Sequence, residues 1–134
     1  MGRRAARESA FKLLYQMEFQ RGEEETQIEG FLQDYAVDPK ERDYFLEVVR
    51  GVASSRAELD AAFSVHLKGW TANRLPRVDL TILRIAAFEI TRRKDVPFSV
   101  AVNEAVELAR KYAAEESRGY INAVLGKLAP AEDR

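Results

Sequence analysis

The chain has 134 residues, of which 46% are hydrophobic, so it is long enough to bury one core, and we expect a single domain over residues 1–134. It has no cysteine, which excludes disulfides and thiolate metal sites and fits a reducing cytoplasm. The sequence shows neither a signal peptide nor a run of roughly 18 apolar residues that could span a membrane. We therefore expect a soluble, cytoplasmic protein with no membrane partner.

The net charge of −1 conceals an uneven distribution of charged residues. Residues 1–21 carry a net charge of +3, residues 22–60 carry −7, and residues 61–134 carry +3. A local basic patch can exist on a protein whose total charge is near zero. Binding to a nucleic acid is therefore not excluded.

The first half of the chain shows helical patterns. Apolar residues recur at helical spacing and predict a first helix over residues 3–20. Thr26 and Glu29 have the spacing of a capping box, which predicts a second helix from there to about residue 36. Asp38 followed by Pro39 predicts the start of a third. Residues 40–67 form one helix or two, because Ser55 is a suitable cap in the middle of the stretch.

The second half continues in the same way. A single helical turn is expected over residues 70–75, and residues 78–91 predict a helix that is apolar almost all round and so surrounded by others. A further helix runs to about residue 112, Ser117 is expected to cap the last, and residues 130–134 form a frayed end. No segment alternates with the period of a strand. We predict an all-α compact bundle of about seven helices, in two halves near 1–68 and 69–130.

The sequence offers little for catalysis. His66 is the one histidine, and without cysteine it cannot complete a zinc site, so we expect it to be a half-buried helix residue. The glycines never form a phosphate-binding loop. Carboxylate pairs such as Glu104/Glu107 and Glu115/Glu116 are more typical of a solvated face than of acid–base chemistry. We expect no catalytic residue, metal or cofactor, and a protein that is not an enzyme.

Arg3, Arg4 and Arg7 fall on one side of the first helix and are expected to point outward together. They either form an ordinary solvated helix end or bind a polyanion. Cations at a helix N-terminus oppose the helix dipole, and a polyanionic partner would offset that cost. Phe11, Tyr15 and Phe19 form an apolar strip on the same helix. This strip either contacts a partner or packs on the second helix, through Ile28, Phe31 and Leu32.

Two further residues attract attention. Arg84 lies within the most apolar helix, so its guanidinium must reach a carboxylate, a backbone carbonyl or the surface. Tyr120 follows Gly119 near the start of the last helix, where its ring could stack on an unpaired base.

Five segments together resemble the NusB family in order and spacing, over nearly the whole chain. They are Arg3-Arg-Ala-Ala-Arg-Glu8 with Leu14-Tyr15, the stretch from Val78 to Glu89, Asp95-Val-Pro97, the stretch from Asn103 to Ala109, and the stretch from Ser117 to Leu125.

The resemblance implies a helical bundle that pairs with NusE, a protein also found in the small ribosomal subunit, and binds the boxA element of nascent RNA. With RNA polymerase and other Nus factors, such a complex promotes transcription antitermination, notably in ribosomal RNA operons. The positions that match the family's RNA contacts are Arg3, Arg4, Arg7, Arg84, Glu116 and Tyr120. Those that match its NusE contacts are Tyr15 and Asp79.

The chain departs from the family pattern at two positions. Ala5 stands where some relatives have a third consecutive arginine, which weakens the expected attraction to phosphate, and Tyr120 replaces a frequent phenylalanine. Two alternatives remain. One is the NusB-like domain attached to ribosomal RNA methyltransferases, although this chain lacks a domain for the methyl donor. The other is a scaffold that forms a homodimer through Phe11 and Tyr15.

Overall fold

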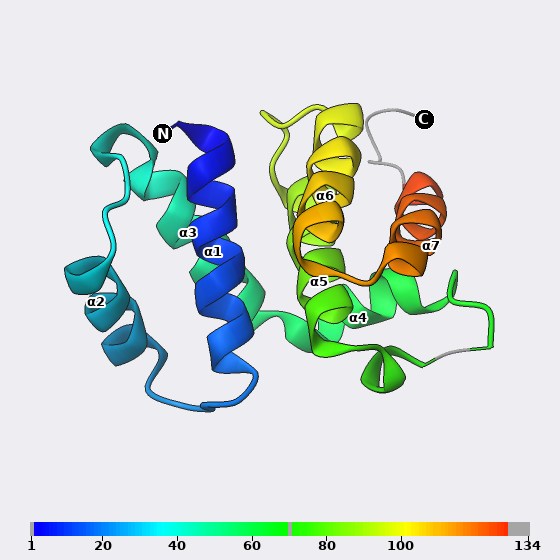
Figure 1. Ribbon diagram of the computed structural model, residues 1–134, viewed down its shortest axis with the longest axis horizontal. Coiled ribbons are helices and arrows are strands. Elements are labelled where there is room, and N and C mark those ends of the chain that lie inside the picture. The colour runs from blue at the N-terminus through cyan, green and yellow to red at the C-terminus, as the bar shows by residue number, and fades with distance from the viewer. Residues whose placement is uncertain (1, 70, 129–134) are drawn as a thin grey trace. The chain divides into compact units, whose positions relative to one another are not determined.

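The computed structural model describes residues 2–69 and 71–128, and within these ranges the chain is helical, without strands. Seven α-helices and two short 3-10 helices occur there, which confirms the predicted all-α class (Figure 1). They form two compact units, residues 1–54 and 55–134. This division lies earlier than the one expected near residues 68 and 69, because α4 (Arg56–Ser64) packs against α5 (Arg77–Arg92). That the whole chain is one domain stays a prediction.

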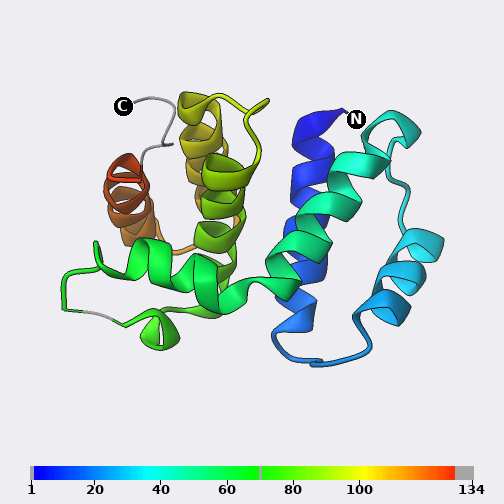
Figure 2. The same cartoon turned by 180° about the vertical axis from the view of Figure 1, so that it is seen from behind.

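Unit 1 contains α1 (Arg3–Met17), α2 (Glu24–Asp34), the 3-10 helix η1 (Pro39–Glu41) and α3 (Arg42–Ser54). α1 packs along α3, as the views from both sides show (Figures 1 and 2), and also contacts α2. The predicted apolar face of α1 is buried, with Leu13 and Met17 fully inaccessible to solvent. The rings of Phe31 and Phe45 stack with centroids 5.7 Å apart, which joins α2 to α3 in the core of this unit.

Two helix ends in unit 1 differ from the sequence predictions. α1 ends at Met17, before residue 20. The predicted capping box is wrong, because α2 begins two residues before Thr26 and its N-cap, Glu23, makes no side-chain cap hydrogen bond. Instead, the side-chain amide of Gln27 donates hydrogen bonds to the backbone carbonyls of Gln20 and Gly22, at 2.7 and 3.0 Å, and so holds the preceding turn in place.

The start of the third predicted helix is confirmed in part. The Asp38 carboxylate accepts a hydrogen bond of 3.0 Å from the backbone N–H of Lys40, with Pro39 in the first position, but the segment that it caps is η1. The question of one helix or two over residues 40–67 is settled in favour of two, α3 and α4, with Ser55 between them. Ser55 is buried, and its hydroxyl accepts a hydrogen bond of 2.7 Å from Arg92 instead of capping α4.

Unit 2 contains α4, the 3-10 helix η2 (Ala72–Arg74), α5, α6 (Phe98–Tyr112) and α7 (Glu115–Gly126). α5 contacts α4, α6 and α7, and every residue from Asp79 to Ile90 is buried. This confirms the prediction of a helix surrounded by others. Of the turn expected over residues 70–75, the structure shows η2, while Trp70 and the tail 130–134 lie outside the described residues. No described helix is long and apolar enough to cross a membrane.

The predicted cap of the last helix is wrong. α7 begins at Glu115, its N-cap is Ala114, and Ser117 lies inside the first turn. The Ser117 side chain is buried and points toward α5 instead, where its hydroxyl donates a hydrogen bond to the carboxylate of Asp79.

Candidate functional site

The basic end of α1 is only partly open to solvent. Arg3 pairs with Glu41, with 2.5 Å between Nε and Oε1, and its guanidinium carbon lies 4.1 Å from the centre of the Tyr44 ring. Arg7 is buried, with 3% of its surface exposed, and its guanidinium carbon lies 5.4 Å from the same ring. Arg4 is exposed. The expectation that all three arginines point outward is therefore wrong for Arg7, because α3 presents Tyr44 to this side of α1.

The aromatic strip of Phe11, Tyr15 and Phe19 begins on α1 and runs from the core to the surface, with Phe19 beyond the end of the helix. Phe11 is 2% exposed, Tyr15 is half-buried, and Phe19 is 64% exposed. The Phe11 and Tyr15 rings stack with centroids 6.0 Å apart, and Tyr15 meets Phe19 edge to face at 5.1 Å. The strip therefore fits both of the interpretations left open, with Phe11 in the core and Phe19 at the surface.

Arg84 forms an ion pair with Asp60 inside unit 2. Its Nε and one terminal nitrogen donate to the two carboxylate oxygens of Asp60 on α4, at 2.7 and 2.8 Å. Only 8% of the Arg84 side chain and 23% of the Asp60 side chain are exposed. Such a two-point contact combines charge attraction with fixed geometry. The requirement that the guanidinium reach a carboxylate, a carbonyl or the surface is thus met by a carboxylate within unit 2.

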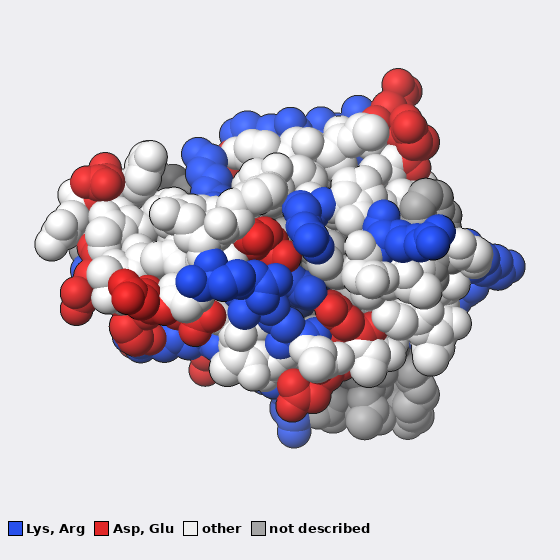
Figure 3. All heavy atoms as spheres, turned by 90° about the horizontal axis from the view of Figure 1, so that it is seen from below, with Lys and Arg blue, Asp and Glu red and all other residues white. Residues whose placement is uncertain are grey.

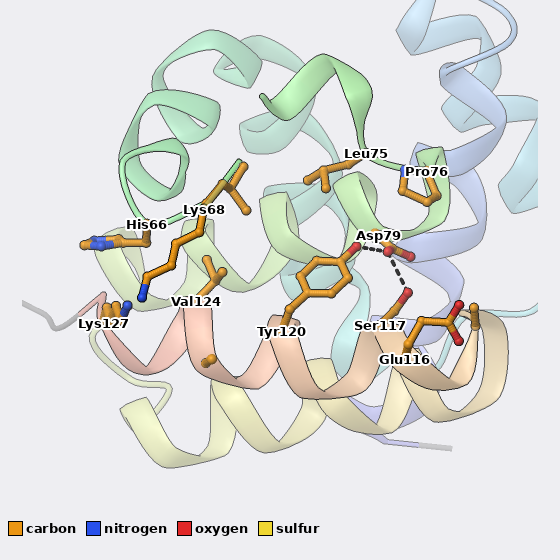
Figure 4. Close-up of a pocket in the computed structure, with 13 residues that line it drawn as sticks. His66, Lys68, Leu75, Pro76, Asp79, Glu116, Ser117, Tyr120, Val124 and Lys127 are labelled. Carbon is orange, nitrogen blue, oxygen red and sulfur yellow. Dashed lines mark hydrogen bonds between the residues drawn. The ribbon is translucent and has the colours of Figure 1, made fainter. Parts of the chain in front are cut away.

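Asp79, in the first turn of α5, lies at the centre of a cluster with α7 (Figure 4). Asp79 is 1% exposed. One oxygen, Oδ2, accepts a hydrogen bond of 2.7 Å from the Ser117 hydroxyl and a second from the hydroxyl of Tyr120. Ser117 and Tyr120 are three residues apart on one helix, so both side chains reach the same side. The cluster thus joins a predicted NusE contact to a predicted RNA contact.

The environment of Asp79 disfavours its charge. Burial raises the pKa of the Asp79 carboxyl above its ordinary value of 3.8, the hydrogen bond from Ser117 acts in the opposite direction, and the nearby carboxylate of Glu116 raises it again. The hydrogen bonds from the hydroxyl groups of Ser117 and Tyr120 offset part of the free-energy cost of desolvating this carboxylate.

The cluster forms one wall of a pocket of about 530 Å³ in unit 2. Most of the wall is apolar, with Leu75, Pro76 and Val124 among its residues. Figure 4 shows Asp79 and Glu116 at one end of this pocket, and at the other end a group of three basic side chains that consists of His66, Lys68 and Lys127. His66 is half-buried, as expected. The pocket thus has an acidic end and a basic end.

Sequence analysis missed the basic end of the pocket and the link from Asp79 to Tyr120. The residues that meet at Asp79 are 38 and 41 positions away along the chain, so no spacing in the sequence indicates their contact. The remaining predicted residues, Arg3, Arg4, Arg7 and Tyr15, belong to α1 in unit 1.

Unit 1 has an acidic side as well as the basic end of α1. Glu24 and Glu25 lie in the first turn of α2, and Glu23 precedes them. Figure 3 shows acidic side chains gathered at the left, the side on which α2 lies in Figure 1. The strongly negative charge of residues 22–60 thus includes a local acidic surface over α2.

The model of the NusB family matches residues 4–130. "Transcription antitermination protein NusB" of Acetivibrio thermocellus is 48% identical over 128 residues, which cover 96% of this chain and 88% of that protein. Among solved structures, T. maritima NusB superposes with a TM-score of 0.87 at 34% identity, covering 96% of this chain and 91% of that one.

A more distant structure shares the fold alone. It is a chain from a complex of the antitermination factors NusB and NusE with dsRNA, with a TM-score of 0.78 at 22% identity, covering 93% of each chain. The family assignment rests on the nearer matches. The curated relatives are named as transcription antitermination proteins, in agreement with the prediction that the chain is not an enzyme. The match to the family model over residues 4–130 and the 48% identity to a curated member show that this chain belongs to the NusB family.

Proposed function

We propose that this chain is a cytoplasmic transcription antitermination factor that binds boxA RNA together with NusE. In this proposal it acts with RNA polymerase and the other Nus factors, and promotes readthrough of terminators, notably in ribosomal RNA operons. The observation that carries the proposal is the similarity, over nearly the whole chain, to relatives named as transcription antitermination proteins. A protein of the same fold, solved with NusE and dsRNA, lends further support.

The proposed RNA contacts are Arg3, Arg4, Arg7, Arg84, Glu116 and Tyr120. Geometry divides them into three groups. Arg3 is half-buried and pairs with Glu41. Arg4 and Glu116 are exposed and Tyr120 is half-buried, so these side chains can meet RNA as they stand. Arg7 and Arg84 are buried against Tyr44 and Asp60, so their first effect is to hold their helices in place. They reach RNA only where those contacts open.

The accessible residues have different proposed roles in RNA recognition. Arginines neutralise backbone phosphates, the ring of Tyr120 stacks on a splayed base, and the carboxylate of Glu116 accepts a hydrogen bond from a base edge. RNA approaches unit 1 at the N-terminal end of α1, where the arginines of that helix attract phosphates. The proposed NusE contacts are Tyr15 and Asp79.

The decisive experiment is a titration of the full chain with boxA RNA and with a scrambled RNA, each with and without NusE. We expect preference for boxA in the presence of NusE. Equal binding of both RNAs there would overturn the proposal. With phosphate contacts from Arg3 and Arg4 alone, log K against log salt should have a slope of about −1.4 for single-stranded RNA, and with Arg7 and Arg84 also released from their internal contacts the slope should approach about −3.

Arg4→Ala tests the phosphate contacts directly. The substitution should make the salt slope shallower by about 0.7, the contribution of one phosphate contact. Lys12→Ala is the matched control, because Lys12 is an exposed cation on the same helix that matches no family contact. If the two variants change the slope equally, the basic end of α1 acts only as a diffuse charge, and Arg4 is not an RNA contact.

A homodimer is the second candidate, favoured by the 64% exposure of Phe19 at the end of the aromatic strip. Large exposed aromatic side chains often mark contact surfaces. Sedimentation of the free chain and of Phe19→Ser separates the two candidates. A dimer that the substitution abolishes supports self-association, whereas a monomeric wild-type chain excludes it.

A further inference from the structure

The hydroxyl of Tyr120 is engaged at the far end of its side chain. The ring lies at the wall of the pocket in unit 2, and the hydroxyl donates to Oδ2 of Asp79 across the α5–α7 contact (Figure 4). Asp79 is itself fixed, since the residue is 1% exposed and its carboxylate accepts a second hydrogen bond from Ser117. A side chain held both at its Cα and at its tip has lost most of its rotamer freedom.

We propose that Asp79 is a positioning residue for Tyr120, holding the ring at the pocket wall in the orientation in which it stacks on an RNA base. The inference rests on the proposed RNA-binding function. Because the ring is ordered before RNA arrives, binding does not have to immobilise it, which improves affinity without a new contact to RNA. Tyr120 provides the stacking surface, and Asp79 acts through it without touching the base.

The hydroxyl of Tyr120 has a structural role that base stacking does not require. Phenylalanine and tyrosine present similar rings to a base, but only tyrosine can donate a hydrogen bond to a carboxylate. The acceptor here is a carboxylate whose burial strengthens its need for donors. Loss of the hydroxyl therefore affects both ends of the contact, the mobility of the ring and the charge state of Asp79.

Several charged or titratable groups face the pocket with Asp79. Glu116 and Tyr120 come from α7, Lys127 follows α7, and His66 and Lys68 follow α4. Substitution of Tyr120 by phenylalanine leaves all the others in place. A change in the titration of Asp79 on this substitution therefore reports the lost hydroxyl, since hydrogen bonds to the charged form lower a carboxyl pKa.

The test compares Tyr120→Phe with the wild-type full chain, by NMR titration of the Asp79 carboxyl and by titration with boxA RNA in the presence of NusE. Tyr35→Phe is the control, because it removes the hydroxyl of a 56% exposed tyrosine in unit 1. In Tyr120→Phe we expect the pKa of Asp79 to rise and RNA affinity to fall about two- to tenfold, the effect of one hydrogen bond. Tyr120→Ala should lose more, because the ring is gone.

The outcomes separate this inference from the proposed function. An unchanged Asp79 titration in Tyr120→Phe overturns the positioning contact, whatever RNA does. A raised pKa with RNA affinity equal to wild type overturns the role of the contact in RNA binding. Absence of boxA binding by the wild-type chain with NusE overturns the proposed function, and with it the role in recognition, while the titration still decides whether Asp79 holds Tyr120.

Discussion

Replacement of Asp60 by alanine would leave the guanidinium of Arg84 buried without its carboxylate. The two groups make a bidentate contact at 2.7 and 2.8 Å, and the Arg84 side chain is only 8% exposed. Removal of one partner from a buried pair costs about 3–5 kcal/mol, mostly the desolvation of the charge left behind. Because water reaches 23% of the Asp60 side chain, we expect a loss near the lower bound, about 3 kcal/mol.

Urea unfolding followed by circular dichroism measures this loss, with the slope against denaturant as a check that the unfolded state is unchanged. Glu29→Ala is the control, because Glu29 is an exposed carboxylate in the interior of α2, and it should alter the free energy of unfolding by less than about 0.5 kcal/mol. The double variant Asp60→Ala with Arg84→Met should recover much of the loss, because no charge is left buried.

A loss below about 1 kcal/mol for Asp60→Ala would refute this reasoning, since such a value is typical of solvent-exposed pairs. It would mean that Arg84 reaches water at small cost and is available for RNA in the free chain. A loss near the expected value, together with recovery in the double variant, would assign Arg84 first to the packing of α4 on α5.

Two further predictions concern charge. The folded pKa of Asp79 lies above its unfolded value, so the neutral carboxyl favours the folded state below about pH 4, and that contribution is lost as pH rises through the folded pKa. The stability of Asp79→Asn relative to wild type, measured by thermal unfolding from pH 3 to pH 7, should therefore improve with rising pH, and a constant difference would contradict the direction of the shift. By contrast, Glu25→Gln should leave the unfolding midpoint at pH 7 nearly unchanged. The hydrogen bond from Arg50 lowers the pKa of Glu25, but both side chains are more than half exposed, so solvent screens their attraction.

The fold was largely predictable because apolar periodicity records which faces are buried. α5 is the clearest case, since a segment without a polar face has to be covered by neighbours, and three helices cover it. Helix ends were less predictable, because local capping patterns compete with tertiary contacts. Thr26 and Ser117 both have the residue type of a cap, yet Thr26 lies within α2, and the Ser117 hydroxyl binds Asp79.

The candidate site was predictable as a set of residues but not as an arrangement. The resemblance to the NusB family points to Arg7, Arg84, Asp79 and Tyr120, and says nothing of what each contacts when RNA is absent. Helical geometry placed Arg7 outward because it counts only the angle around α1, whereas Tyr44 of α3 covers that position. The partner of Arg84 likewise comes from another helix, which no spacing within the chain reveals.

Tyr120 is one of the two positions at which the chain departs from the family pattern, and it makes a contact that phenylalanine could not make. Tyr120 carries one oxygen more than phenylalanine, and that oxygen donates a hydrogen bond to a buried carboxylate with a raised pKa. The same carboxylate is a proposed contact for NusE. A hydrogen-bond donor of NusE that binds Oδ2 of Asp79 would compete with the hydroxyls of Ser117 and Tyr120. NusE binding and the positioning of the Tyr120 ring would then depend on the same acceptor oxygen. Coupling between two ligands is reciprocal, so RNA bound at Tyr120 must then change the affinity for NusE by the same factor by which NusE changes the affinity for RNA.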